Sequence, residues 1–356
     1  MWHRQELTRR SFLSAAVAAA SASAVPTMRG EDGVNAAGRP LKICVFSDIH
    51  YEVGRWTNTD DTSFLEKIMA RAERESCDMM IHCGDFMHGV SKDWQKAYLK
   101  LYHSAKVPAY HVLGNHDQDK DPTKAVCEAY RMPAGYYFFD KGGFRFVVAD
   151  PNYIRTADGR FVHYEKCNNF RVKGGASTTW IPPEELEWLR SVIVGSPLPC
   201  VVLSHQSFER GNRDPVKNAD EVRAIFNEAN AKKPGTVRLV MNGHLHSDNL
   251  RILDGILYWD VNSANYHWFG KVHDKYPAEY IKQHPGCVRT LGWTEPLSGV
   301  LTLWPEGRIR IEGSRADWLF GVTPKTAGFY VCDDDGREAH PAIQSADVTI
   351  APLFTT

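Results

Sequence analysis

The stretch LKICVFSDIH, residues 41–50, is an apolar run typical of a buried strand that ends in Asp48 and His50. Four later segments repeat this pattern, each placing Asp, Asn or His directly after a short apolar run. They are Gly84-Asp85, Gly114-Asn115-His116-Asp117, Ser204-His205 and Gly243-His244-Leu245-His246. A strand end holds a side chain in place and the turn after it leaves that side chain accessible. Five such ends, if they converge, predict one polar site.

The segments between these strand ends predict an α/β fold. Helical spacing over residues 63–76 and 93–103 separates the apolar runs 41–47, 78–83 and 108–113. This alternation indicates parallel strands joined by crossover helices. In the second half, Lys141-Gly142-Gly143 predicts a hairpin. We also expect helices over 183–193 and 220–229, and strands over 199–203, 237–241, 249–253, 256–261, 299–304 and 308–312.

The residue types at the strand ends suit two neighbouring metal ions. Two cations repel each other, so an anionic ligand is needed between them, and Asp85 on its glycine turn is the candidate. Imidazole and carboxylate ligands together favour Fe, Mn or Zn over Ca or Mg. His244 and His246 can reach different ions if the backbone turns sharply, and Gly243 makes such a turn easy.

Composition indicates a soluble globular protein. The chain has 356 residues, of which 43% are hydrophobic and 24% charged, with a formal net charge of −1. No global basic field draws it to nucleic acid, which disfavours a nuclease without excluding one. Eight cysteines form no C-x-x-C pair, so a zinc–thiolate site is not expected.

The N-terminus has the features of an export signal. Thr8-Arg9-Arg10-Ser11-Phe12-Leu13 is a twin-arginine block, followed by a mild apolar run and a small-residue cleavage site at Ala22-Ser23-Ala24. Residues 1–24 are therefore expected to be a twin-arginine signal peptide, and 25–40 a linker. After removal of the signal peptide, no segment is long enough to span a membrane, and a periplasmic or extracellular location is predicted.

The five segments together resemble the pattern of the calcineurin-like metallophosphoesterases, which is D-x-H, G-D, G-N-H-[DE], an isolated His and G-H-x-H. The resemblance implies a four-layer α/β/β/α sandwich of two mixed sheets over residues 41–313, followed by a C-terminal extension, 314–356, of unknown role. It implies one metal held by Asp48, His50 and His246. It implies another held by Asn115, His205 and His244, with Asp85 shared between them.

The resemblance also implies a reaction. A hydroxide bridging the two metals would attack phosphorus, and His116, oriented by Asp117, would assist the leaving oxygen. Purple acid phosphatases have D-x-G and a metal-binding Tyr where this chain has His50 and His88. The chain therefore looks closer to the cyclic-nucleotide and glycerophosphodiester phosphodiesterase branch. His88 itself has two interpretations, a substrate-facing residue or a polar loop residue.

The sequence thus predicts an exported binuclear-metal phosphodiesterase acting on a small phosphate ester. A phosphomonoesterase, a nuclease of the same superfamily and a non-catalytic metal or phosphate binder remain alternatives. The natural substrate, the identity of the metals and the oligomeric state are left open by the sequence.

Overall fold

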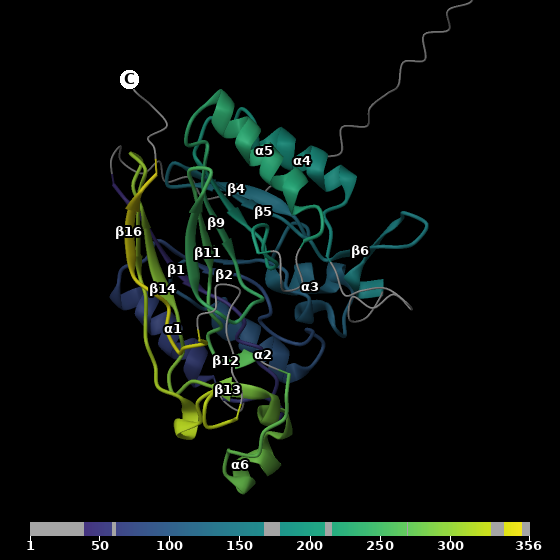
Figure 1. Ribbon diagram of the computed structural model, residues 1–356, viewed down its shortest axis with the longest axis vertical. Helices are drawn as coiled ribbons and strands as arrows, with labels where there is room; N and C mark the ends of the chain where they lie inside the picture. Colours follow the sequence, from purple (N-terminus) through teal and green to yellow (C-terminus); the bar gives the residue numbers. More distant parts are fainter. Residues whose placement is uncertain are drawn as a thin grey trace, which may run out of the picture.

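The computed structural model describes residues 39–58, 62–166, 179–210, 216–268, 270–328 and 338–350. The predicted signal peptide, 1–24, and all but the last two residues of the predicted linker lie outside these ranges. Two six-stranded mixed sheets form the centre of the molecule (Figure 1).

The first sheet combines three strands from the N-terminal third of the chain with three from its C-terminal part. Its order is β16 (Ala346–Thr349), β15 (Arg308–Glu312), β14 (Gly299–Leu303), β1 (Leu41–Phe46), β2 (Met79–His82) and β3 (Ala109–His111). The strands β1, β2 and β3 are parallel, as the alternation of strands and helices predicts. Their C-terminal ends therefore meet at one edge of the sheet.

The second sheet brings two further predicted ligand strands to a common edge. Its order is β10 (Asn249–Leu253), β11 (Ile256–Asp260), β9 (Val237–Asn242), β8 (Cys200–Leu203), β5 (Phe144–Val148) and β4 (Tyr137–Lys141). The strands β5, β8, β9 and β11 are parallel. The hairpin between β4 and β5 turns at Gly142 and Gly143, both with positive φ, which confirms its prediction.

Helices cover the outer faces and complete the four predicted layers. The first sheet carries α1 (Ser63–Arg74) and α2 (Asp93–Tyr102), and the second carries α4 (Pro183–Ile193) and α5 (Ala219–Lys232) (Figure 1). The period of two along the strands explains the layering. On the second sheet, Val202 and Val240 pack with α4 and α5, whereas Leu203 and Met241 join the core shared with the first sheet.

Several short elements were not predicted. They are α3 (Thr123–Tyr130), the hairpin of β6 (Tyr153–Arg155) and β7 (Phe161–His163), the pair β12 (Tyr266–Trp268) and β13 (Thr290–Gly292), and α6 (Ala278–Gln283). The strand β16 falls within 314–356 and pairs antiparallel with β15, so this part of the C-terminal segment extends the first sheet. The side chains of Arg308 and Asp347 join the two strands, with Nε–Oδ1 and Nη2–Oδ2 distances of 2.8 and 2.6 Å.

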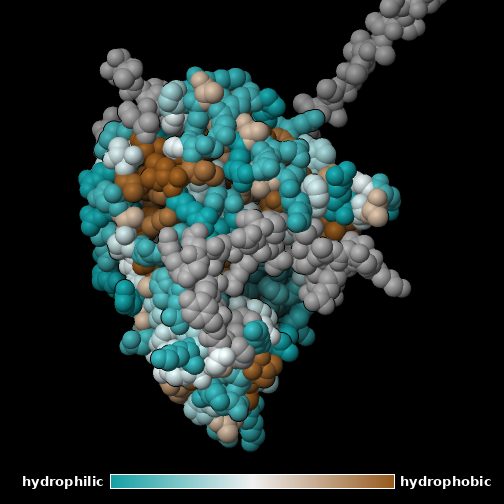
Figure 2. Space-filling view, in the orientation of Figure 1, coloured by the Kyte–Doolittle hydropathy of each residue, from teal (hydrophilic) through white to brown (hydrophobic). Residues whose placement is uncertain are grey.

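Hydrophilic side chains dominate the face of the molecule seen in Figure 2, with an apolar area at its upper left. Within the described ranges, none of the helices combines the length and the hydropathy that a membrane crossing requires.

Candidate metal centre

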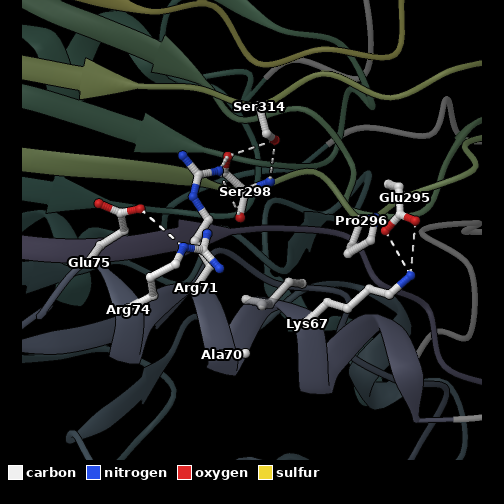
Figure 3. A pocket seen from close by; sticks show the side chains of 10 residues that line it. Lys67, Ala70, Arg71, Arg74, Glu75, Glu295, Pro296, Ser298 and Ser314 are labelled. Carbon is white, nitrogen blue, oxygen red and sulfur yellow. Dashed lines mark hydrogen bonds and ion pairs between the residues drawn. The ribbon is translucent and has the colours of Figure 1, made fainter.

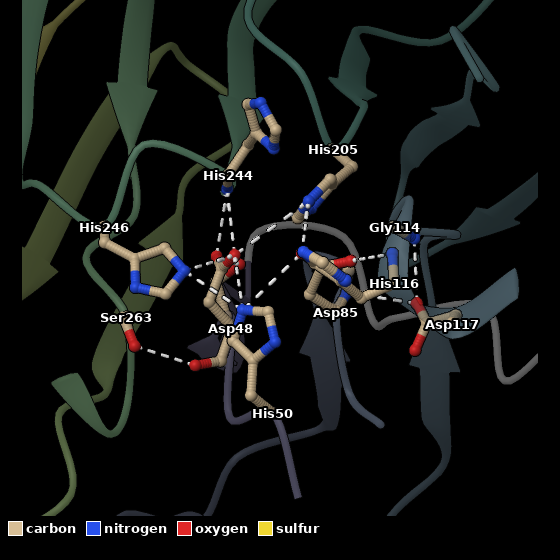
Figure 4. Close-up of polar contacts among 12 residues, drawn as sticks. Asp48, His50, Asp85, Gly114, His116, Asp117, His205, His244, His246 and Ser263 are labelled. Atoms are coloured by element: carbon tan, nitrogen blue, oxygen red, sulfur yellow. Dashed lines mark hydrogen bonds and ion pairs between the residues drawn. The ribbon is translucent and has the colours of Figure 1, made fainter. Parts of the chain in front are cut away.

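Ligand-type side chains from both sheets converge where the parallel strands end (Figure 4). Two groups of three stand close enough to hold an ion each, their ligand atoms lying within 4.8 Å of one another. One group is Asp48, His50 and His246, and the other is Asp85, His205 and His244. The structure thus brings together six of the seven ligands expected from the sequence, divided as the resemblance implies.

Asp85 lies between the two groups. Its Oδ2 is 3.1 Å from Nε2 of His205 in one group and 3.5 Å from Nε2 of His50 in the other. Its Oδ1 accepts a hydrogen bond of 2.8 Å from the backbone N–H of His116. A carboxylate in this place can serve both groups, which is the role expected of it.

Asn115, the seventh expected ligand, is buried and directly precedes His116, whose backbone N–H binds Asp85. Its side-chain Oδ1 has no hydrogen-bond partner among the described residues, although the residue is only 6% exposed. A buried acceptor without a donor is costly. A cation bound next to Asp85 would supply the missing interaction, so this orphaned oxygen fits a metal ligand.

Each of three ligand histidines is oriented through its Nδ1 atom. Nδ1 of His205 lies 2.9 Å from the carbonyl oxygen of Cys83, and Nδ1 of His246 lies 2.7 Å from that of Tyr266. A carbonyl only accepts, so both Nδ1 atoms carry a proton, and Nε2 is the nitrogen of each ring that faces the ligand cluster. In His50, Nδ1 faces Nε2 of His88 at 3.3 Å. Such support from outside the ligand shell is typical of metal-binding histidines.

The Nε2 atoms of two ligand histidines meet beside Asp48. Nε2 of His50 and Nε2 of His246 lie 3.0 Å apart, and Oδ1 of Asp48 is 3.3 Å from the latter. Two imidazole nitrogens and a carboxylate oxygen at these distances are stabilised by a positive charge among them, either a shared proton or a metal ion. The donor set therefore fits a divalent or trivalent ion.

The local backbone is bent to make this convergence possible. Five of the expected ligands have left-handed φ values between 48 and 68°: Asp48, His50, Asp85, His244 and His246. Such conformations cost non-glycine residues roughly 1–2 kcal/mol each and gather at functional sites. Gly114 and Gly243 allow the close approach, since a Cβ on either would lie 2.1 Å from Oδ1 of Asp85 or 2.4 Å from Oδ2 of Asp48, respectively.

His116 stands at the edge of the ligand cluster, with its side chain 28% exposed. Its Nδ1 lies 2.7 Å from Oδ2 of Asp119. Burial lowers the pKa of His116, but the carboxylates of Asp85 and Asp119 more than offset this and raise that pKa to about 9. The ring can therefore hold a proton on Nε2, the nitrogen left free by Asp119.

The expectation that Asp117 orients His116 is wrong. The carboxylate of Asp117 instead accepts from four backbone N–H groups and from the hydroxyl of Tyr130. The backbone donors are those of Asp85, Phe86, Met87 and Gly114, at 2.8–3.1 Å. Asp117 thus fixes the turn that carries Asp85, and Asp119 takes the place beside the histidine ring.

Two residues beside the site were missed or left undecided at the sequence level. Asp119 was missed, although its spacing of three from His116 is that of neighbours in a 3₁₀ turn. His88 is a polar residue of the loop after β2, but it is only 2% exposed and lies between His50 and Asp119. His88, His116 and Asp119 form a third group of ligand-type side chains.

A separate hollow of about 400 Å³ lies between α1 and the segments 295–298 and 314 (Figure 3). Its basic side chains are already engaged. The guanidinium group of Arg71 donates to the carbonyl oxygens of Ser298, Glu312 and Gly313, and Lys67 binds Glu295 at 2.8 Å. Arg74 pairs with Glu75 at 3.5 Å, so each basic side chain that lines the hollow already has an acidic or carbonyl partner.

Comparison with known proteins agrees with this geometry. The chain is similar to probable inactive purple acid phosphatase 14 of Arabidopsis thaliana, with 24% identity over 345 residues, covering 75% of this chain and 83% of the relative. Its fold is similar to the crystal structure of a dimetal phosphatase from Danio rerio, with a TM-score of 0.55 at 13% identity, covering 88% of this chain and all of the other. Residues 41–248 match the calcineurin-like phosphoesterase family. Because that match spans more than half of the chain, the protein belongs to the calcineurin-like phosphoesterase family.

Proposed function

We propose that the protein is a binuclear-metal phosphoesterase that hydrolyses small phosphodiesters. The observation that carries the proposal is the pair of three-residue ligand groups sharing Asp85, with a histidine beside them that belongs to neither group. Two bound ions of Fe, Mn or Zn would supply an activated water and offset negative charge on the phosphoryl oxygens.

The chain's own residues supply the rest. His116 holds a proton on Nε2 and can pass it to the leaving oxygen of the ester, because Asp119 occupies its Nδ1. The backbone N–H of His116 also binds Oδ1 of Asp85, so the acid and the shared carboxylate are positioned by the same turn. Asp117 holds this turn against the start of the loop after β2.

The preference for diesters rests on sequence. The combination of His50 in the first motif and the Gly114–Asp117 block resembles the phosphodiesterase branch of the family. A net charge of −1 favours a small substrate over nucleic acid. The twin-arginine block at residues 8–13 supports action outside the cytoplasm.

A second candidate is a metal-binding protein without turnover. The relative from Arabidopsis thaliana is named a probable inactive phosphatase, and this name is the observation that favours the alternative. The pairing of His116 with Asp119 favours the enzyme, because it holds a proton donor beside the two ligand groups that belongs to neither of them.

The test is hydrolysis of bis(p-nitrophenyl) phosphate and of p-nitrophenyl phosphate by metal-loaded protein. Chelation should abolish activity and add-back of Mn²⁺, Zn²⁺ or Fe²⁺ should restore it, with the diester hydrolysed faster. His205→Ala should lose metal and activity together. Asp93→Asn is the matched control, because the Asp93 side chain is fully exposed at the start of α2.

Two results would contradict the proposal. Full activity after thorough chelation would exclude a metal-dependent reaction. Two equivalents of tightly bound metal without turnover of either ester would establish the binder instead. If the monoester is hydrolysed faster than the diester, the protein is still a phosphoesterase, but the proposed preference for diesters is wrong. A panel of nucleotides, glycerophosphodiesters and single-stranded DNA would then identify the substrate class.

A further inference from the structure

We propose that His88 and Asp119, here called the connecting pair, join the metal ligand His50 to the proton donor His116 and position both rings. This inference rests on the proposed function, since it assumes that His116 protonates the leaving group. Three contacts make the connection. His50 Nδ1 lies 3.3 Å from His88 Nε2, His88 Nδ1 lies 3.0 Å from Asp119 Oδ2, and His116 Nδ1 lies 2.7 Å from the same oxygen.

The chemistry of Asp119 sets the direction of every hydrogen bond in this series. Burial raises the pKa of Asp119, but hydrogen bonds from His116 and His88 lower it well below its usual value, so the carboxylate is ionised. An ionised carboxylate only accepts. Both Nδ1 atoms facing it must therefore carry protons.

The proton on Nδ1 of His88 also determines the protonation of the metal ligand His50. With its proton on Nδ1, neutral His88 presents Nε2 as an acceptor, and His50 must donate to it from Nδ1. His50 is left with a lone pair on Nε2, which faces Oδ1 of Asp48 and Nε2 of His246. One carboxylate thus selects the metal-binding form of His50 and the orientation of His116.

The connecting pair is rigidly held. The hydroxyl of Tyr164 donates to Oδ1 of Asp119 at 2.8 Å, the oxygen that the histidines leave free. The side chain of Gln95 donates to the carbonyl oxygen of His88 at 2.8 Å. The His88 ring stands 5.3 Å from that of His50 and 4.7 Å from that of His116, centroid to centroid. Both connecting residues therefore act as positioning residues within a packed shell.

The first test separates positioning from general damage by using two leaving groups. An aryl diester with a good leaving group needs little protonation, whereas an alkyl glycerophosphodiester needs much. His116→Ala should lose roughly 10²–10⁴-fold in kcat on the alkyl ester and far less on the aryl ester. When metal is saturating, so that weaker binding through His50 does not limit the rate, Asp119→Asn should show the same selective loss. Asp119→Glu should recover part of it, and Tyr164→Phe, which spares Oδ2, should lose little.

A double-mutant cycle tests whether Asp119 acts through His116. If it does, Asp119→Asn should cost nothing further in the His116→Ala background when both variants are assayed at saturating metal. Equal losses on both esters, or additive losses in the double variant, would overturn the positioning role of Asp119.

Two further measurements do not depend on turnover. Chelator competition should show a metal affinity about 10–100-fold weaker in His88→Phe, because His50 loses its support. Nitrogen-15 correlation spectra of histidine-labelled, zinc-loaded protein should show the Nδ1–H form of His88. Unchanged affinity, or a proton on Nε2 of His88, would overturn the connection to His50.

The outcomes also separate this inference from its foundation. If the wild-type protein hydrolyses no ester, the proposed function fails, while affinity and spectra still decide whether the connection exists. If a third equivalent of metal binds and disappears in Asp119→Asn, the group of His88, His116 and Asp119 is a cation site and the positioning role is wrong.

Discussion

Replacement of Asp117 by Asn should lower the free energy of unfolding, because Asp117 holds the site together and does not take part in proton transfer. The Oδ1 atom accepts from the N–H groups of Phe86 and Met87 at 2.9 and 3.1 Å and from the Tyr130 hydroxyl at 2.6 Å. Oδ2 accepts from the N–H groups of Asp85 and Gly114 at 3.0 and 2.8 Å. The carboxylate therefore satisfies five buried donors with two oxygens.

The magnitude follows from this count. An asparagine has one oxygen, so even in its better orientation it leaves the two donors on the Oδ2 side facing an NH₂ group. Each buried donor without an acceptor costs about 1–3 kcal/mol, so Asp117→Asn should lose about 2–6 kcal/mol of unfolding free energy. Typical domains have a total of about 5–15 kcal/mol, so the loss would be large.

Urea unfolding in the presence of chelator is the appropriate assay. Chelation removes the stabilisation that bound metal contributes, so that only the hydrogen bonds are compared. Tyr130→Phe removes one donor and keeps the acceptor, and should cost about 1 kcal/mol. Asp119→Asn should cost less than Asp117→Asn, because the Asp119 side chain is 17% exposed and binds no backbone N–H in the contacts described above.

One result would refute this reasoning. Suppose that the unfolding free energy of Asp117→Asn lies within about 1 kcal/mol of the wild-type value, yet its rate falls as that of His116→Ala does. Asp117 then has the role in orienting His116 that was first expected from the sequence. The two aspartates should instead show opposite behaviour, with stability lost at Asp117 and rate lost at Asp119.

Other perturbations test the ligand groups and the leader. His244→Ala and His246→Ala should each lower the metal content from two equivalents to one, measured by elemental analysis, because they belong to different groups; loss of both ions in each variant would argue for a single site. Gly114→Ala should reduce metal content in folded protein, since its Cβ would lie 2.2 Å from the backbone nitrogen of Asp85; an unaltered content would show that the turn can relax. Substitution of Arg9 and Arg10 by Lys should retain the protein in the cytoplasm, which cell fractionation would measure; unchanged export would argue against the twin-arginine signal.

The convergence of the ligands was predictable because it follows from local patterns, whereas the layer order was implied by the family resemblance. Each ligand is next to its own strand, and parallel strands bring their ends to one edge whatever the intervening loops do. The short elements were not predictable in the same way. The strand β16 is only four residues long and is defined by its pairing with β15. The residues of β16 alone do not indicate this pairing.

The partner of His116 was mispredicted for a geometric reason. The segment His116–Gln118 is a 3₁₀ helix, in which residues three apart lie on the same side. Asp119 therefore faces the His116 ring, while Asp117, one residue along, points toward the loop after β2. The sequence places two carboxylates shortly after His116, and only the type of turn determines which one contacts the ring.

The division of labour between these carboxylates bears on whether the protein catalyses. The strained ligand backbone and the Asp117 network serve metal binding, and a binder and an enzyme need them equally. The contact between Asp119 and His116 lies outside both ligand groups, and its effect is to leave a proton on a nitrogen that no ligand uses. Asp119 affects metal retention through its contact with His88, whereas proton transfer to a leaving group needs its contact with His116. The leaving-group dependence of Asp119→Asn is therefore the measurement that separates the two functions.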